Sequence, residues 1–151
     1  MMQMLLWMTI AFCWMTVGLA CRCLQPTPAV TDYCQKDIVF RGRPVAVYGT
    51  NAPSRIYTFE VDEIFWSKRS FAGRTRLNVT TSNNSCGEHF GLNIPFVIAA
   101  TELNGQLSTS LCSGNKQWNS LDINLQRLPQ TSYEQLCTSI NNFNQAVAQR
   151  S

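Results

Sequence analysis

The sequence predicts a mainly β fold with flanking helices (α+β), in which five strands close a small barrel. Five runs of strand-like residues lie between positions 37 and 111, and turn residues separate them. Apolar residues take up helical spacing from Ser132 onward, and positions 24–36 are compatible with a short helix after two prolines. Five strands with a helix at either end fit an OB-fold-like closed β-barrel.

The chain begins with an apolar segment typical of a secretion signal peptide. Residues 1–20 contain no charged residue and no histidine, and they end in Gly18 and Ala20, the small residues that signal peptidase reads. About 20 apolar residues could also span a bilayer, but this segment contains polar residues and no basic cluster follows it. We therefore expect a signal peptide at 1–20, one domain at 21–151, and a secreted, extracellular product without a membrane span.

The charge balance gives little support to nucleic-acid binding. The chain carries 12 basic and 9 acidic residues, a net charge of +3, and the basic residues are scattered rather than blocked. Two basic groups could bind sulfated glycans or extracellular matrix, or could form solvated strand faces. They are Arg41 with Arg43, and Lys68 with Arg69, Arg74 and Arg76.

Cysteine usage indicates disulfides. The signal peptide contains Cys13, and six cysteines remain after it: Cys21, Cys23, Cys34, Cys86, Cys112 and Cys137. An even count in a secreted chain implies three bridges, and composition does not choose among the fifteen pairings. A metal site has weak support, because the sequence has no C-x-x-C pair and only one histidine, His89. We expect no cofactor and no metal site of its own.

The first two strands show alternating polarity. Positions 38–47 read as a strand with a bulge at Gly42, and the turn cluster 49–54 follows. Over 56–66 most of the pattern has period two, with three residues expected to face the core. These residues are Tyr57, Phe59 and Val61.

The later elements are shorter. Residues 73–81 give a third strand, and 96–100 form a continuous apolar run expected to be buried on both faces. Asn104-Gly105 predicts a two-residue hairpin that leads into a fifth strand at 106–111. The final helix is expected to begin at Ser132 as its cap. Its apolar positions are Tyr133, Leu136, Ile140, Phe143 and Val147.

Two sequons fit a secretory route, although sequons also arise by chance. They make Asn78 and Asn83 candidate N-glycosylation sites on exposed turns. An enzyme has little support, because every cysteine of the secreted chain is expected in a bridge and only the thiolate is reactive. We therefore predict that the protein is not an enzyme.

The cysteines and their neighbours form a specific set. Cys21-x-Cys23 opens the expected mature chain, Cys34 precedes the first strand, and Cys86-Gly87 closes the loop after the third. Further members are Pro26, Pro28, Cys112, Trp118-Asn119-Ser120-Leu121, Tyr133 and Cys137. In this pattern the chain resembles the amino-terminal, netrin-like (NTR) domain of the tissue inhibitors of metalloproteinases. With 14 residues after Cys137, we expect a single-domain form.

The resemblance implies a disulfide pairing and a mechanism. The implied bridges are Cys21–Cys86, Cys23–Cys112 and Cys34–Cys137. In the family, the α-amino and carbonyl groups of the terminal cysteine, here Cys21, chelate the catalytic zinc of the target protease. The protease-contact ridge carried over to this chain comprises Arg22, Cys23, Leu24, Asn84 and Ser85. The expected partner is a zinc metalloprotease of the matrix metalloproteinase, adamalysin or astacin type.

Two residues depart from the family pattern. The residue after the terminal cysteine enters the S1′ pocket of the protease and is typically Thr or Ser, whereas this chain has Arg22; Gln25 replaces a usual proline. An unpaired guanidinium in an apolar S1′ pocket would cost several kcal/mol. The chain is thus expected to act on a protease with an acidic or open S1′ site. The alternative is a netrin-like extracellular binding or matrix-interaction module that has lost inhibition.

The mature terminus provides a direct test of this interpretation. Edman sequencing or intact mass of the secreted protein should give Cys21 as the first residue, with a free amine. An additional residue or an acetyl group would remove the chelating amine and leave only the binding-module interpretation.

Overall fold

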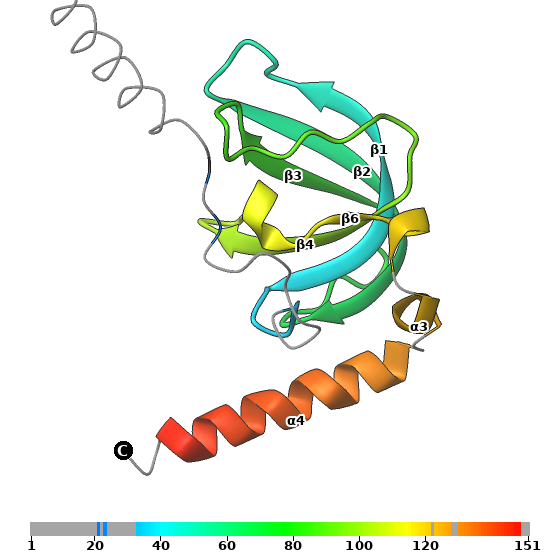
Figure 1. The fold of residues 1–151 in the computed structure, drawn as a ribbon, viewed down its shortest axis with the longest axis vertical. Helices are drawn as coiled ribbons and strands as arrows, with labels where there is room; N and C mark the ends of the chain where they lie inside the picture. Colours follow the sequence, from blue (N-terminus) through cyan, green and yellow to red (C-terminus); the bar gives the residue numbers. More distant parts are fainter. Residues whose placement is uncertain (1–20, 22, 24–32, 122, 128–129, 149–151) are drawn as a thin grey trace, which may run out of the picture.

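A β-sheet that closes on itself forms the centre of the fold (Figure 1). The computed structural model describes residues 21, 23, 33–121, 123–127 and 130–148. Its strands are β1 (Ile38–Tyr48), β2 (Ser54–Ser67), β3 (Arg76–Ser82), β4 (Phe96–Leu103), β5 (Gln106–Ser108) and β6 (Lys116–Gln117). The sheet order is β1-β2-β3-β5-β4-β6, and an additional β1–β4 pairing closes the first five into a barrel. The predicted OB-fold-like α+β barrel is confirmed.

Strand β1 closes the barrel because it pairs with two neighbours. It runs antiparallel to β2 over its whole length and to β4 from Ile38 to Gly42. The register with β2 shifts between Arg41 and Gly42, as the predicted bulge requires. A Cβ atom at Gly42 would lie 2.6 Å from the carbonyl oxygen of Glu60, so the close approach of the two strands needs glycine here.

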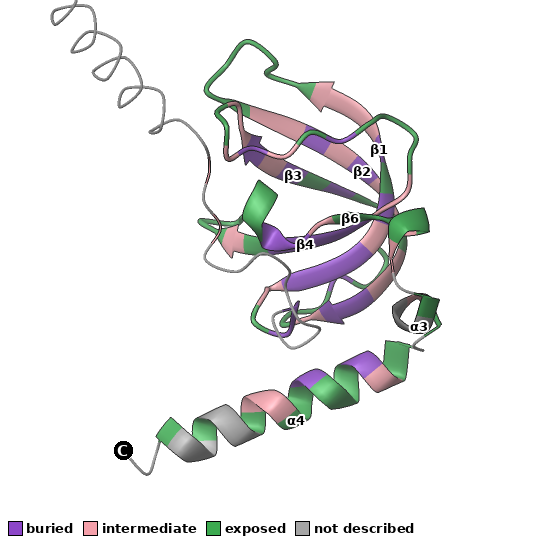
Figure 2. Cartoon of the chain, viewed as in Figure 1, coloured by how far each residue is buried: buried purple, intermediate pink, exposed green. Residues whose placement is uncertain are grey.

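The apolar residues form two hydrophobic clusters. Figure 2 shows the buried positions, in purple, along the strands and on the C-terminal helix. One cluster fills the barrel and receives Tyr57 and Phe59, with Val61 packed against it, as alternation in β2 predicts. The other lies between the barrel and α4 (Gln130–Ala148), the long helix below the barrel in Figure 1. Strand β4 contributes to both clusters, which confirms burial on both of its faces.

Several element boundaries differ from the prediction. The third strand begins at Arg76, and β5 ends at Ser108 because Leu111–Ser113 forms a 3-10 turn. Helix α4 begins at Gln130, directly after Pro129 in the sequence, so Ser132 as its cap is wrong. Leu136 is 39% exposed, whereas Tyr133 and Cys137 are buried.

Other predictions fall wholly or partly outside the described residues. The structure does not describe the signal segment 1–20, nor positions 24–32 of the predicted helix at 24–36. The described part also includes α3 (Ile123–Gln126), a single turn. Among the described helices, none has both the length and the apolar character needed to cross a membrane.

Asp37 ties three strands together at one end of the barrel. Its backbone N–H donates to the carbonyl of Ala100 at 3.0 Å, and its Oδ2 accepts from the Glu102 N–H at 2.6 Å. Its Oδ1 lies 2.9 Å from Nζ of Lys68, just after β2. Burial alone would raise the pKa of Asp37, but the bonds from Glu102 and Lys68 together hold it below its usual value.

This arrangement predicts an acid-sensitive contribution to stability. The pKa of Asp37 is lower in the folded chain than in the unfolded chain, where it is about 3.9. Its contribution is therefore present above about pH 4 and lost as the pH falls through the folded value. Asp37→Asn should lower the free energy of unfolding by about 0.5–1 kcal/mol near neutral pH, and this loss should shrink as the pH falls through the folded pKa of Asp37. Urea unfolding across this pH range measures the difference, and a loss that persists in acid would contradict the assignment.

Candidate functional site

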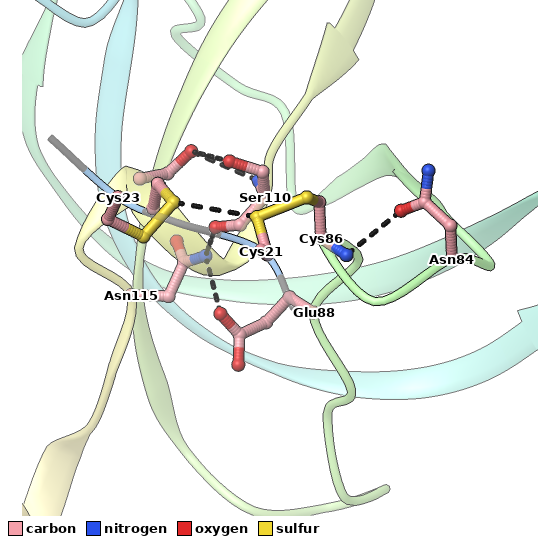
Figure 3. Close-up of a disulfide and its surroundings, with 9 residues drawn as sticks. Cys21, Cys23, Asn84, Cys86, Glu88, Ser110 and Asn115 are labelled. Carbon is pink, nitrogen blue, oxygen red and sulfur yellow. Dashed lines mark hydrogen bonds between the residues drawn. A yellow bond between two sulfur atoms is a disulfide. The ribbon is translucent and has the colours of Figure 1, made fainter. Parts of the chain in front are cut away.

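Two disulfides meet at one rim of the barrel (Figure 3). Cys21 is bonded to Cys86 and Cys23 to Cys112, and Sγ of Cys21 lies 3.9 Å from Sγ of Cys112. Cys112 is exposed and the other three half-cystines are half-buried. Cys21 and Cys23, which have one residue between them in the sequence, are therefore each fixed at the rim by a covalent bond.

The third disulfide has a different setting. Cys34 and Cys137 are fully buried, and their bond joins the segment before β1 to α4 within the second hydrophobic cluster. All three bridges are those that the resemblance implied. The pairing is therefore confirmed, including the two bridges at the rim.

The loop that carries Cys86 is shaped by the side chain of Asn84. Its Oδ1 accepts from the Cys86 N–H at 2.9 Å and from Oγ of Ser82 at 2.6 Å, and its carbonyl accepts from the Gly87 N–H at 3.0 Å. Gly87 follows with no room for a side chain, since a Cβ atom would lie 1.7 Å from the Ser82 carbonyl oxygen. Asn84 and Ser85 thus lie exposed on a tight turn beside the Cys21–Cys86 bond.

Cys112 lies in the 3-10 turn Leu111–Ser113, which its flanking residues cap. The Ser110 N–H donates to Oγ of Ser113 at 3.0 Å, and Gly114 ends the turn in the left-handed region with φ of 86°. The Leu111 N–H donates to the carbonyl of Cys86 at 3.0 Å. This backbone bond links the two loops that receive the first two bridges.

A polar network under the two bridges is organised by Asn115. Its Nδ2 donates to Oγ1 of Thr109 at 2.9 Å, to the Ser110 carbonyl at 3.1 Å and to Oε2 of Glu88 at 3.4 Å. Its Oδ1 accepts from the N–H of Ala99 in β4 at 2.9 Å. Burial raises the pKa of Glu88, and the hydrogen bond from Asn115 opposes that rise. The network anchors the rim to the barrel wall.

Tyr33 connects this rim to the third bridge. It precedes the buried Cys34, and its hydroxyl donates to the carbonyl of Gly114 at 2.7 Å. Burial raises the pKa of Tyr33, and burial together with Tyr33 raises the pKa of Tyr133 to about 12. The described part of the chain leaves no buried side-chain nitrogen or oxygen without a hydrogen-bond partner.

The structure brings together part of the predicted contact ridge. Figure 3 shows Cys21 in its bond to Cys86, with the Cys23–Cys112 bridge on one side and Asn84 on the other. Arg22 and Leu24 lie outside the described residues. Sequence reasoning did not identify Asn115, Tyr33 or Glu88 as supports. They act over long sequence separations, and no local pattern marks them.

Four of the basic residues form ion pairs with acidic neighbours. Arg41 and Arg43 pair with acidic residues of β2, and Arg41 also covers the ring of Trp118. Lys68 pairs with Asp37, and Arg69 with Glu102 at 2.6 Å. These pairings favour solvated strand faces over a glycan site at these four positions. Matrix and sulfated-glycan binding stay predictions.

The fold and the rim define a class of protein: a disulfide-rich barrel of the kind found in oxidising, extracellular compartments, with its first half-cystines displayed on the surface. A comparison with known families agrees with this class. The family model described as tissue inhibitor of metalloproteinase matches residues 19–143, and the chain therefore belongs to that family. Members of this family are inhibitors rather than enzymes. A search of curated proteins found no match.

Gly87 provides a test of the rim geometry. Gly87→Ala should destabilise the protein by about 1–3 kcal/mol, because its Cβ would overlap the Ser82 backbone and displace the Cys86 loop. Gly91→Ala is the matched control, since its Cβ would meet only the flexible end of Ile94, at 2.7 Å. Denaturant unfolding of both variants measures the effect, and equal losses would show that the overlap at Gly87 relaxes.

Proposed function

We propose that the mature chain is a secreted inhibitor of zinc metalloendopeptidases that binds the catalytic zinc of the protease through Cys21. Signal cleavage after Ala20 would give Cys21 a free α-amino group next to its carbonyl oxygen. A catalytic zinc has three protein ligands and an open position that holds water. The two donor atoms of Cys21 would take that position and displace the nucleophilic water.

The observation that carries this proposal is the pair of adjoining bridges at the rim. Cys21 and Cys23 are each bonded to a loop that hydrogen bonds hold in place. Immobilising a free chain end on binding would subtract from affinity, and here the ordering precedes binding. The amine must be neutral to coordinate. Because a terminal amine has a pKa of about 7.7–8.0, binding should release a proton.

The surface around the chelating residue would set the choice of protease. Arg22 is directed at the S1′ pocket, while Cys23 and Leu24 continue along the cleft. Asn84 and Ser85, exposed beside the first bridge, extend the ridge on the other side. A guanidinium favours a target whose S1′ site is acidic or open to water.

The free amine is the decisive test. The mature protein should inhibit at least one protease from a panel of matrix, adamalysin-type and astacin-type enzymes. The same protein with one alanine added before Cys21 should lose at least about a hundredfold in inhibition constant. Unfolding curves of the two forms serve as the folding control. If both forms are inactive on the whole panel, the netrin-like binding module is the better description.

Substitution at the pocket-entering residue tests the role of Arg22. Arg22→Thr should lower the inhibition constant on matrix metalloproteinases at least about tenfold, because an unpaired guanidinium no longer enters an apolar pocket. Arg22→Lys is the matched control, since it keeps the charge and should give no gain. Equal potency of the native and threonine proteins would refute the pocket argument.

A further inference from the structure

Both polar atoms of the Asn83 side chain form hydrogen bonds within the fold. The two hydrogens of its Nδ2 are shared among three carbonyls, those of Gly49 at 3.0 Å, Thr50 at 3.2 Å and Ala52. Its Oδ1 accepts from Nε of Arg55, and its backbone N–H donates to the Pro53 carbonyl at 2.9 Å. Asn83 therefore ties the turn between β1 and β2 to the loop that begins after β3.

Asn78 belongs to the other sequon and has a different environment. The expectation of exposed turns is wrong for both sequons, because Asn83 is half-buried and Asn78, although exposed, lies within strand β3. Asn78 borders a groove that Arg74, Arg76 and Gln106 also line. Its Oδ1 accepts from Oγ1 of Thr58 at 2.8 Å, and within the described residues its Nδ2 donates to no acceptor. The bond from Thr58 holds the amide in place while leaving the nitrogen accessible.

We propose that the secreted protein carries an N-linked glycan on Asn78 and none on Asn83. The co-reactant is an oligosaccharide on a lipid diphosphate: the Nδ2–C1 bond forms, the bond from C1 to the diphosphate breaks, and Nδ2 loses one proton. Asn78 keeps its Oδ1 and hence the bond from Thr58 after modification. Asn83 would lose a donor from a nitrogen that faces three carbonyls, and a bulky sugar would separate the two loops.

The location of the glycan is compatible with the proposed inhibitory site. Asn78 precedes Asn83 by five residues on an extended strand, which is about 16 Å. A glycan there would lie on the strand face, away from Asn84 and Ser85. The inference rests on the secretory route of the proposed function but not on inhibition.

Glycan mapping on the secreted protein tests the assignment. Enzymatic deglycosylation in heavy-oxygen water converts an occupied asparagine to a labelled aspartate, and the label should appear on Asn78 only. Thr80→Ala removes one sequon and should remove all glycan mass, while Ser85→Ala removes the other and should leave the mass unchanged. A label on Asn83, or an unmodified Asn78, would overturn the proposal. If Cys21 is the free terminus and the chain inhibits, the proposed function survives that result.

Hydrogen exchange tests whether the side-chain amide of Asn83 holds the turn between β1 and β2. Asn83→Asp replaces the donating nitrogen by an oxygen facing three carbonyls, so exchange of the Ala52 and Asn83-position amides should accelerate at least about tenfold. Ser85→Ala is the matched control, because it leaves the amide of Asn83 intact and should not change exchange of these amides. Unchanged exchange in Asn83→Asp would show that the amide does not hold the turn.

Discussion

Two adjoining disulfides at the barrel rim determine both the stability of this protein and the placement of its candidate site. Cys21–Cys86 and Cys23–Cys112 span 65 and 89 residues, and the chain-entropy model gives each a contribution of about 4–5 kcal/mol. Either value is comparable with the net stability of a small domain. The bonds that stabilise the barrel are thus also the bonds that hold Cys21 and Cys23 at the rim, so a change to either bridge should affect folding and the candidate site together.

Hydrogen bonds around the bridges supply precision that covalent bonds alone lack. A disulfide still allows its two loops to move, but the side chains of Asn84, Ser113 and Asn115 each hold a neighbouring backbone group in a fixed position. The Leu111–Cys86 backbone bond then joins the two loops directly. Such a fully satisfied polar network rigidifies the rim, and under the proposed function this rigidity would remove the ordering cost of binding through Cys21.

The sequence was most informative where one local rule decides the structure. Period-two alternation located β1 and β2, the apolar run located β4, and Asn104-Gly105 located a hairpin whose residues have φ of 52° and 79°. The end of β5 was misplaced because Ser110 and Ser113 cap a 3-10 turn directly after it, and the start of α4 lies two residues before the serine that was expected to cap it. The disulfide pairing needed the family resemblance. Supports such as Tyr33 and Asn83 depend on distant partners and leave no local signature.

The three bridges differ in their access to solvent, and this difference separates two kinds of damage. A thiol reductant reaches the surface bridges Cys21–Cys86 and Cys23–Cys112 before the enclosed Cys34–Cys137 bond. Mild reduction should therefore break the bridges of Cys21 and Cys23, while the Cys34–Cys137 bridge still links the segment before β1 to α4. In a reducing environment, the candidate site at the rim would therefore lose its covalent support before the barrel loses its link to α4.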